Sequence, residues 1–387
     1  MNLATEVNTI PKLLRNVVDN IHPPEAGFLL EKVGDTWQEI TYKETLDNAD
    51  AISAFLLEMG IQKGDRLGFI IENSPEYVFY DQAIQQIGGV NVSIYPTLSE
   101  VEIEYILNDS SAKTILVGSH FLFKKILKIA DNCAALQLII PAFEDYEKQL
   151  SSVTPKAEII SFKNLLEKGK AEVSRFLSKI SEIRGSILPE DLASLIYTSG
   201  TTGIPKGVML THANFVLNAQ VALQQIPVIE KTDVFLSFLP LSHVFERTAT
   251  YHVCCTAGCK IAFAHSLELL ARNMTEVKPT VMIVVPRLLE RIHDRAMKSG
   301  TAAGGTKAKI FLWALKTGRK FRETKEAGNT PGMFLSLQQK LADKLVFSKI
   351  KEKTGGRLKF FVSGGAALPK NVGEIFGDLG IKTLDGF

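Results

Sequence analysis

A stretch rich in glycine and hydroxyl side chains, between Tyr197 and Met209, has the composition of an anion-binding loop. Glycine lets backbone N–H groups approach a ligand closely, and successive N–H groups with Ser and Thr hydroxyls form a cradle for negative charge. Lys206 adds a mobile positive charge that suits a phosphate. The order of residues fits neither a Walker A loop nor the G-x-G-x-x-G dinucleotide loop. The candidate phosphate-binding residues are Thr198, Ser199, Gly200, Thr201, Thr202, Gly203 and Lys206.

His243 is the second residue that could do chemistry. It follows an expected strand, Val234–Phe238, and ligands lie at strand ends in α/β sheets. A histidine can donate a hydrogen bond to a carboxylate. A histidine taken by itself is more often a structural residue, so its sequence neighbours must decide between the two interpretations. Glu246 and Arg247 follow closely, and we assign them no chemistry of their own.

Three closely spaced cysteines, Cys254, Cys255 and Cys259, invite a metal-site interpretation. Structural zinc sites usually combine two Cys-x2–4-Cys units from separate places, whereas this chain has one cluster among apolar neighbours. We therefore expect core cysteines and assign no metal ligands. Four cysteines in 387 residues also make no disulfide framework, which favours a reducing, cytoplasmic location.

Short apolar segments alternate with longer amphipathic ones, and this alternation predicts an α/β fold built from βαβ units. Residues 143–190 show only weak patterning, and residues 299–308 are expected to form a loop between two basic helices. The expected strands are Leu67–Ile71, Val90–Tyr95, Thr114–Val117, Leu136–Ile140, Leu192–Tyr197, Val234–Phe238, Lys260–Phe263, Val281–Val285 and Leu358–Val362. The expected helices are Tyr42–Met59, Pro75–Ile87, Ser99–Leu107, Phe121–Ala130, Asn214–Gln224, Leu267–Val277, Arg287–Met297 and Leu335–Lys353.

Five segments, in the order in which they occur, resemble signatures of the adenylate-forming (AMP-binding) superfamily. Thr198–Gly207 looks like its signature loop, and Asn91–Thr97 resembles an earlier strand of the family. Leu239–Thr248 is similar to a motif of the long-chain fatty acyl-CoA synthetases. Ser363–Leu368 resembles the loop beside adenine, and Asp385–Phe387 the opening of a Gly-Tyr-Gly-x-Thr-Glu motif. By this resemblance the chain is identified as the N-terminal portion of a member of the long-chain branch.

The resemblance implies a two-step ligation of a fatty acid to CoA, with ATP, Mg²⁺ and CoA as cofactor, metal and co-substrate. The acid attacks the α-phosphate of ATP to form an acyl-adenylate, and a thiol then displaces AMP. The family pattern implies that the loop around Lys206 holds the β- and γ-phosphates and that His243 helps to place the acid. The remaining cofactor-binding residues implied by the pattern are Gly364, Gly365, Ala366, Asp385, Gly386 and Phe387.

The resemblance also implies the domain organisation. It predicts two α/β subdomains in a layered αβαβα arrangement, residues 1–185 and 186–387, with the second incomplete at its C-terminus. The Thr-Glu pair that helps to bind magnesium would follow Phe387, and the C-terminal lid domain would come later. We therefore expect a truncated ligase with little activity by itself.

Charge is balanced over the whole chain, with 44 basic and 42 acidic residues, but it is uneven along it. Residues 287–359 contain 18 Lys and Arg against 6 Asp and Glu, a local net charge of +12. Apolar residues from Ile310 to Leu315 lie among these cations, so this helix could rest on a membrane surface. The alternative is a set of solvated basic helix faces.

The first ten residues lack a signal-peptide pattern, and no run of about 18 apolar residues occurs. We expect a cytoplasmic protein that could be peripheral on the inner face of the membrane, with no nucleic-acid partner. Two functional alternatives stay open at this point. One is a fatty acyl-AMP ligase that feeds a carrier protein, and the other is a non-catalytic module that binds nucleotide or acyl groups.

Overall fold

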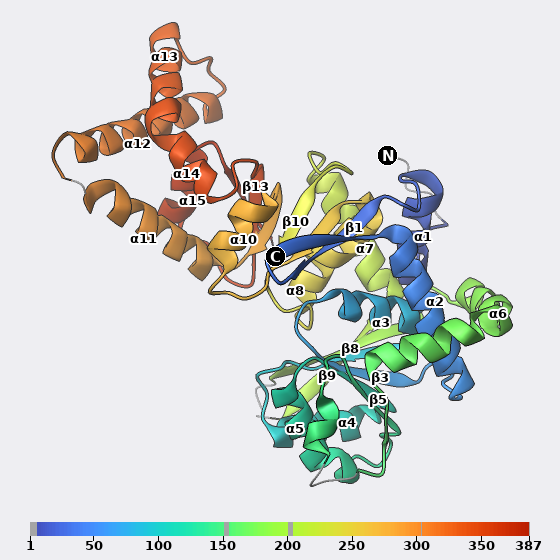
Figure 1. Cartoon of the computed structure of the whole chain (residues 1–387). Coiled ribbons are helices and arrows are strands. Elements are labelled where there is room, and N and C mark those ends of the chain that lie inside the picture. The colour runs from blue at the N-terminus through green and yellow to red at the C-terminus, as the bar shows by residue number, and fades with distance from the viewer. Residues whose placement is uncertain (1–5, 151–154, 200–203, 303, 387) are drawn as a thin grey trace. The chain divides into compact units, whose positions relative to one another are not determined.

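The computed structural model describes residues 6–150, 155–199, 204–302 and 304–386, and Figure 1 shows their helices and strands. The chain divides into two compact units. Unit 1 comprises residues 1–231 and 240–260, and unit 2 comprises residues 232–239 and 261–387. The predicted α/β class is confirmed, because the strands form parallel-rich sheets flanked by helices.

Unit 1 is built on a seven-stranded sheet with the order β7-β6-β5-β3-β4-β8-β9. Its pairs are parallel except for β8 and β9, which form an antiparallel hairpin. The strands β4, β5 and β6 are buried at every position, which explains why most of their residues are apolar. The strands are β3 (Arg66–Ile70), β4 (Val90–Ser93), β5 (Thr114–Val117), β6 (Leu138–Pro141), β7 (Glu158–Ile159), β8 (Leu192–Ser199) and β9 (Pro205–Thr211).

The helices of unit 1 begin at recognisable caps. Thr41 and Ser99 each form a capping box with the glutamate three residues later, which satisfies two otherwise unpaired backbone donors. An antiparallel hairpin of β1 (Gly27–Val33) and β2 (Thr36–Thr41) precedes the second helix. The helices are α1 (Ile10–Asn20), α2 (Tyr42–Glu58), α3 (Pro75–Gln86), α4 (Glu100–Ser110), α5 (His120–Ile129), α6 (Phe162–Ser186), α7 (His212–Gln225), α8 (Val244–Glu246) and α9 (Val253–Ala257).

Unit 2 contains the strand order β14-β13-β12-β10-β11. Three pairs are parallel: β10 with β12, β12 with β13, and β13 with β14. The strands are β10 (Val234–Ser237), β11 (Lys260–Phe263), β12 (Val281–Val284), β13 (Phe360–Ser363) and β14 (Lys382–Asp385). The helices are α10 (Leu270–Val277), α11 (Pro286–Ala302), α12 (Gly305–Glu326), α13 (Met333–Ala342), α14 (Ser348–Lys353) and α15 (Lys370–Asp378).

Two sequence expectations need correction. Residues 299–308 are mostly helical, because α11 continues to Ala302 and α12 begins at Gly305. The weakly patterned region 143–190 contains α6, whose buried residues Leu165, Gly169, Phe176 and Ile180 form a narrow stripe between charged faces. Among the residues described, no helix has the length and apolar character that a membrane span requires.

Candidate functional site

The phosphate-loop motif lies at the tip of the β8–β9 hairpin. Residues 200–203 (Gly200, Thr201, Thr202 and Gly203) are outside the described part of the chain, and β8 and β9 precede and follow them. Thr198 pairs with Lys206 across the hairpin, and both side chains are exposed. Directly opposite residues of an antiparallel pair point to the same face. A hydroxyl and an ammonium group are therefore presented side by side at the base of the loop.

The next pair of the hairpin fixes its geometry. Tyr197 pairs with Gly207, and its hydroxyl donates a 2.6 Å hydrogen bond to Oδ2 of Asp109. Burial and this hydrogen bond both raise the pKa of Tyr197, so the phenol keeps its proton. A Cβ atom at position 207 would lie 3.1 Å from the Tyr197 ring, which is tighter than ordinary contact. Glycine at this position leaves room for the Tyr197 ring.

His243 stands at the start of α8 in unit 1. Its Nδ1 accepts a 3.1 Å hydrogen bond from the backbone N–H of Phe245, so the neutral ring carries its proton on Nε2. Partial burial lowers the pKa of His243, which keeps the ring neutral near pH 7. The ring meets Tyr95 edge to face, with 6.4 Å between centroids. The geometry therefore offers one oriented N–H donor at a partly exposed position.

The segment before His243 is fixed to α3 and β4. Tyr77 of α3 donates to the carbonyl oxygen of Leu241 at 3.2 Å, and its hydroxyl also lies 2.9 Å from Oγ of Ser93. The side-chain oxygen of Asn73 accepts a hydrogen bond from the backbone N–H of Leu241 at 2.8 Å. The approach to His243 is thus held by polar contacts on both sides of Leu241.

The segment after His243 is held by a buried ion pair that the sequence did not reveal. Arg247 donates to Oδ1 of Asp81 at 3.0 Å and to Oγ of Ser194 at 2.8 Å. Asp81 also accepts a 2.8 Å hydrogen bond from the side chain of Asn91. The backbone N–H of Arg247 donates to the carbonyl of His243. Since Ser194 belongs to β8, Arg247 connects the His243 segment to the strand that leads into the phosphate-loop hairpin.

The remaining predicted residues gather in unit 2, at the carboxyl ends of two adjacent parallel strands. Gly364, Gly365 and Ala366 follow β13, and Gly386 follows Asp385 at the end of β14. The N–H of Gly386 donates to the carbonyl of Ser363 at 2.7 Å, which joins the two strand ends. Gly365 has φ +78°, a conformation that side chains rarely adopt. Phe387, the predicted stacking residue, lies outside the described residues.

The prediction that these three cysteines lie in the core is confirmed. Cys254, Cys255 and Cys259 are fully buried free thiols. Burial raises the pKa of Cys254 and Cys255 well above the usual range, so these thiols are protonated and unreactive.

A family model described as AMP-binding enzyme matches residues 21–386. The chain belongs to the AMP-binding enzyme family. This AMP-binding chain is 32% identical to fatty acyl-CoA synthetase A from Dictyostelium discoideum over 347 residues. The aligned region covers 89% of this chain and 48% of that relative. It is 29% identical to the long-chain-fatty-acid–CoA ligase FadD15 from Mycobacterium tuberculosis over 369 residues. That alignment covers 94% of this chain and 58% of the relative. The chain therefore spans about half the length of these two relatives.

Solved structures support the fold of the AMP-binding chain. A long-chain-fatty-acid-CoA ligase (FadD1) from Archaeoglobus fulgidus superposes with a TM-score of 0.64 at 19% identity, covering 96% of this chain and 60% of that one. The A-PCP didomain of a carboxylic acid reductase from Segniliparus rugosus, in complex with AMP, gives a TM-score of 0.73 at 17% identity. The superposition covers 99% of this chain and 53% of the didomain chain. The resemblance to the adenylate-forming superfamily is thus confirmed in sequence and in fold.

Proposed function

We propose that this chain supplies the ATP- and fatty-acid-binding part of a long-chain fatty acid–CoA ligase. The observation that carries the proposal is the pairing of exposed Thr198 with exposed Lys206 at the base of the Gly- and Thr-rich loop. An ammonium group beside a hydroxyl suits the β- and γ-phosphates of ATP. The assignment to fatty acids is supported by relatives named as long-chain fatty acyl-CoA synthetases or ligases, which match 86–96% of the chain.

In the proposed reaction the fatty acid carboxylate attacks the α-phosphate, and the bond from that phosphorus to the bridging oxygen of pyrophosphate breaks. A thiol of CoA then attacks the acyl carbon, loses its proton, and AMP leaves. Lys206 and Thr198 would hold the departing phosphates, so that charge developing on them meets a fixed cation. His243 would donate Nε2–H to the carboxylate and orient it.

The residues that we propose for adenine binding lie in unit 2. The glycines after β13 expose backbone against which a planar base could lie, and Asp385 ends the neighbouring strand. Mg²⁺ accompanies ATP in this class of reaction. Within the described ranges, no group of three or more His, Cys, Asp or Glu side chains is arranged to hold a metal ion, so we assign no residue to Mg²⁺.

The nucleotide assignment is tested by titrating ATP into the 387-residue chain in a calorimeter. Replacing Lys206 with alanine removes a charge-assisted contact worth about 1.5–3 kcal/mol, so ATP should bind about ten- to a hundredfold more weakly. Lys170→Ala, an exposed lysine on α6, is the matched control and should leave the affinity unchanged. Equal ATP affinities for Lys206→Ala and the unmodified chain would contradict the assignment.

The acyl assignment needs a separate measurement. Palmitate-dependent exchange of pyrophosphate into ATP reports the first step without a thiol acceptor; we expect this exchange to be weak in the chain by itself, and Lys206→Ala should reduce it further. Comparing CoA with an acyl carrier protein as acceptor then tests the second step. Transfer to the carrier protein alone would contradict the CoA ligase assignment and leave the ATP-binding result intact.

A further inference from the structure

Helix α13 in unit 2 carries an unusually exposed apolar face. Among the residues of α13, Ala342 is buried and Leu335 is half-buried, whereas the other large apolar residues are exposed. The exposed fractions are 91% for Met333, 73% for Phe334, 65% for Leu337, 49% for Leu341 and 40% for Leu345, the last lying in the adjoining π-helical turn η4 (Asp343–Phe347). Steps of one, three and four residues place these side chains on one side of the helix.

This face differs from the one that the sequence suggested. The earlier candidate was the apolar run on α12, in which Ile310 and Leu312 are exposed, Phe311 is buried, and Trp313 and Leu315 are half-buried. Phe311 occupies the space beside Gly300 of α11, where a Cβ atom would lie 2.5 Å from its ring. Helix α12 therefore turns much of its apolar surface toward its own neighbours, and α13 presents the outward apolar surface.

Cations accompany the apolar face. Lys340 follows Leu337 by three residues, Lys344 follows Leu341 by three, and both lysines are exposed. Helix α13 contains no Asp or Glu. The segment 287–359 around it has a net charge of +12. An apolar stripe with exposed lysines on it is typical of helices that lie in the interface of a lipid bilayer.

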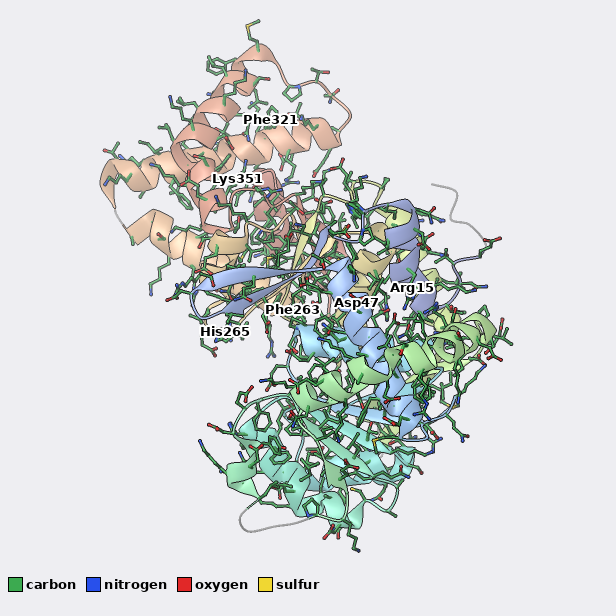
Figure 2. The ribbon with its side chains drawn as sticks, turned by 45° about the vertical axis from the view of Figure 1, so that its right-hand side comes forward. Arg15, Asp47, Phe263, His265, Phe321 and Lys351 are labelled. Atoms are coloured by element: carbon green, nitrogen blue, oxygen red, sulfur yellow. The ribbon has the colours of Figure 1, made fainter. Side chains whose placement is uncertain are left out.

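The position of α13 within unit 2 suits such contact. Figure 1 shows α13 at the end of the helical group, with α12 and α14 between it and the strands of the same unit. Figure 2, turned by 45°, gives the same arrangement, with Phe321 of α12 and Lys351 of α14 below that end. In neither view do the strands of unit 2 cover α13.

We infer that the face formed by Met333, Phe334, Leu337, Leu341 and Leu345 docks on an anionic lipid bilayer. The apolar side chains enter the boundary between headgroups and acyl chains, while Lys340 and Lys344 contact lipid phosphates. Net positive charge and the lack of acidic residues on α13 favour a negatively charged bilayer over a neutral one. This inference does not depend on the proposed ligase activity.

The test is co-sedimentation of the chain with vesicles, in the absence of ATP, fatty acid and CoA. The chain should sediment with vesicles of phosphatidylcholine and phosphatidylglycerol, and much less with phosphatidylcholine alone. Higher salt should weaken binding, because the Debye length falls from about 10 Å at 0.1 M to about 3 Å at 1 M. Failure of the unmodified chain to sediment with anionic vesicles at low salt would overturn the inference.

Two variants assign the binding to α13. Phe334→Glu with Leu337→Glu should reduce the partition coefficient more than about tenfold, because two apolar anchors are lost. Lys340→Gln with Lys344→Gln should reduce it about thirtyfold at low salt, from loss of two cations near the lipid surface. These side chains are exposed, so folding should be preserved, which circular dichroism checks.

The matched control is Phe121→Glu, because Phe121 is 67% exposed on α5 of unit 1. It should sediment like the unmodified chain. An equal loss in Phe121→Glu would overturn the assignment to α13. If Phe334→Glu with Leu337→Glu instead abolishes a concentration-dependent dimer in analytical ultracentrifugation and leaves vesicle binding unchanged, the face joins two copies of the chain and the lipid inference is wrong.

Discussion

The guanidinium group of Arg247 lies 3.0 Å from Oδ1 of Asp81, and both side chains are completely buried. The two residues are far apart in sequence, and the pair joins helix α3 to the segment that begins at His243. A buried ion pair is costly to break, because the remaining charge has no water to solvate it. Arg247 is therefore a positioning residue, one that acts through the backbone it anchors.

Removing one partner of this ion pair should lower the free energy of unfolding much more than replacing both partners does. Asp81→Leu alone leaves Arg247 charged and buried, and should lower the free energy of unfolding by about 3–5 kcal/mol. The double variant with Arg247→Met should recover at least half of that loss. Urea unfolding followed by circular dichroism measures both. Lys128→Met, at the exposed pair with Glu100, should cost less than about 1 kcal/mol. Additive losses in the double variant would contradict the coupling.

Acid should destabilise unit 1 through His212, whose ring is fully buried. Its Nδ1 accepts a hydrogen bond from the backbone N–H of Ile10 at 3.3 Å. Burial is the main cause that lowers the pKa of His212 to about 4; the charge of Asp191 opposes this shift, and the charges of Lys63 and Arg247 add to it. The unfolded chain takes up a proton near pH 6.5, so stability is full above pH 6.5 and falls as the pH drops toward 4.

The size of this effect follows from the two pKa values. A difference of about 2.5 units corresponds to roughly 3 kcal/mol lost between pH 6.5 and 4. His212→Gln should flatten the dependence of unfolding free energy on pH over this window. His252 and His243, whose pKa values are also lowered by burial, should leave part of the slope in place. Identical slopes in the variant and the unmodified chain would rule out His212 as a cause.

Gly169 of α6 lies against the backbone of α2, so a side chain at this position should destabilise the fold. A Cβ atom there would lie 2.1 Å from the carbonyl oxygen of Ala51, which is backbone and cannot rotate away. Gly169→Ala should therefore cost about 1–3 kcal/mol or more in unfolding free energy. Gly185→Ala, in the same helix with nothing within 4 Å, should be neutral or stabilise by up to about 1 kcal/mol. Thermal unfolding of the two variants compares them directly, and equal effects would contradict the close packing.

The donor assigned to His243 predicts a specific loss of fatty acid binding. His243→Ala removes the Nε2–H group and should weaken palmitate binding about tenfold or more, the range of a hydrogen bond to a charged group. His243→Gln keeps an amide donor and should restore part of the affinity. Calorimetry at pH 7.5, with ATP affinity measured in parallel, separates this loss from unfolding. Unchanged palmitate binding in both variants would remove His243 from the acyl site.

Much of the strand framework could be predicted from the sequence, because buried parallel strands consist mostly of apolar and β-branched residues. The expected ranges Thr114–Val117 and Lys260–Phe263 agree with β5 and β11. Helix α6 was missed because its buried stripe is narrow and includes Gly169, so charged faces dominate its composition. The extent of the two basic helices was also wrong, because glycines around residue 304 suggested a longer loop.

The site could be predicted only in part. The phosphate-loop hairpin follows from local composition, since glycines, hydroxyl residues and a lysine are adjacent in sequence. The role of Arg247 does not, because its partner Asp81 is distant in the chain and no local pattern pairs them. Its neighbour Glu246 obscured it further, as two adjacent opposite charges are usual on a solvated helix.

The chain crosses between its two units at three places, near residues 231, 239 and 260. Strand β10 lies between β12 and β11 in the strand order of unit 2, yet it is encoded between two stretches of unit 1. Expression of residues 261–387 alone would therefore delete an interior strand and separate β11 from β12. A single cut in the gene therefore isolates neither unit with all of its strands.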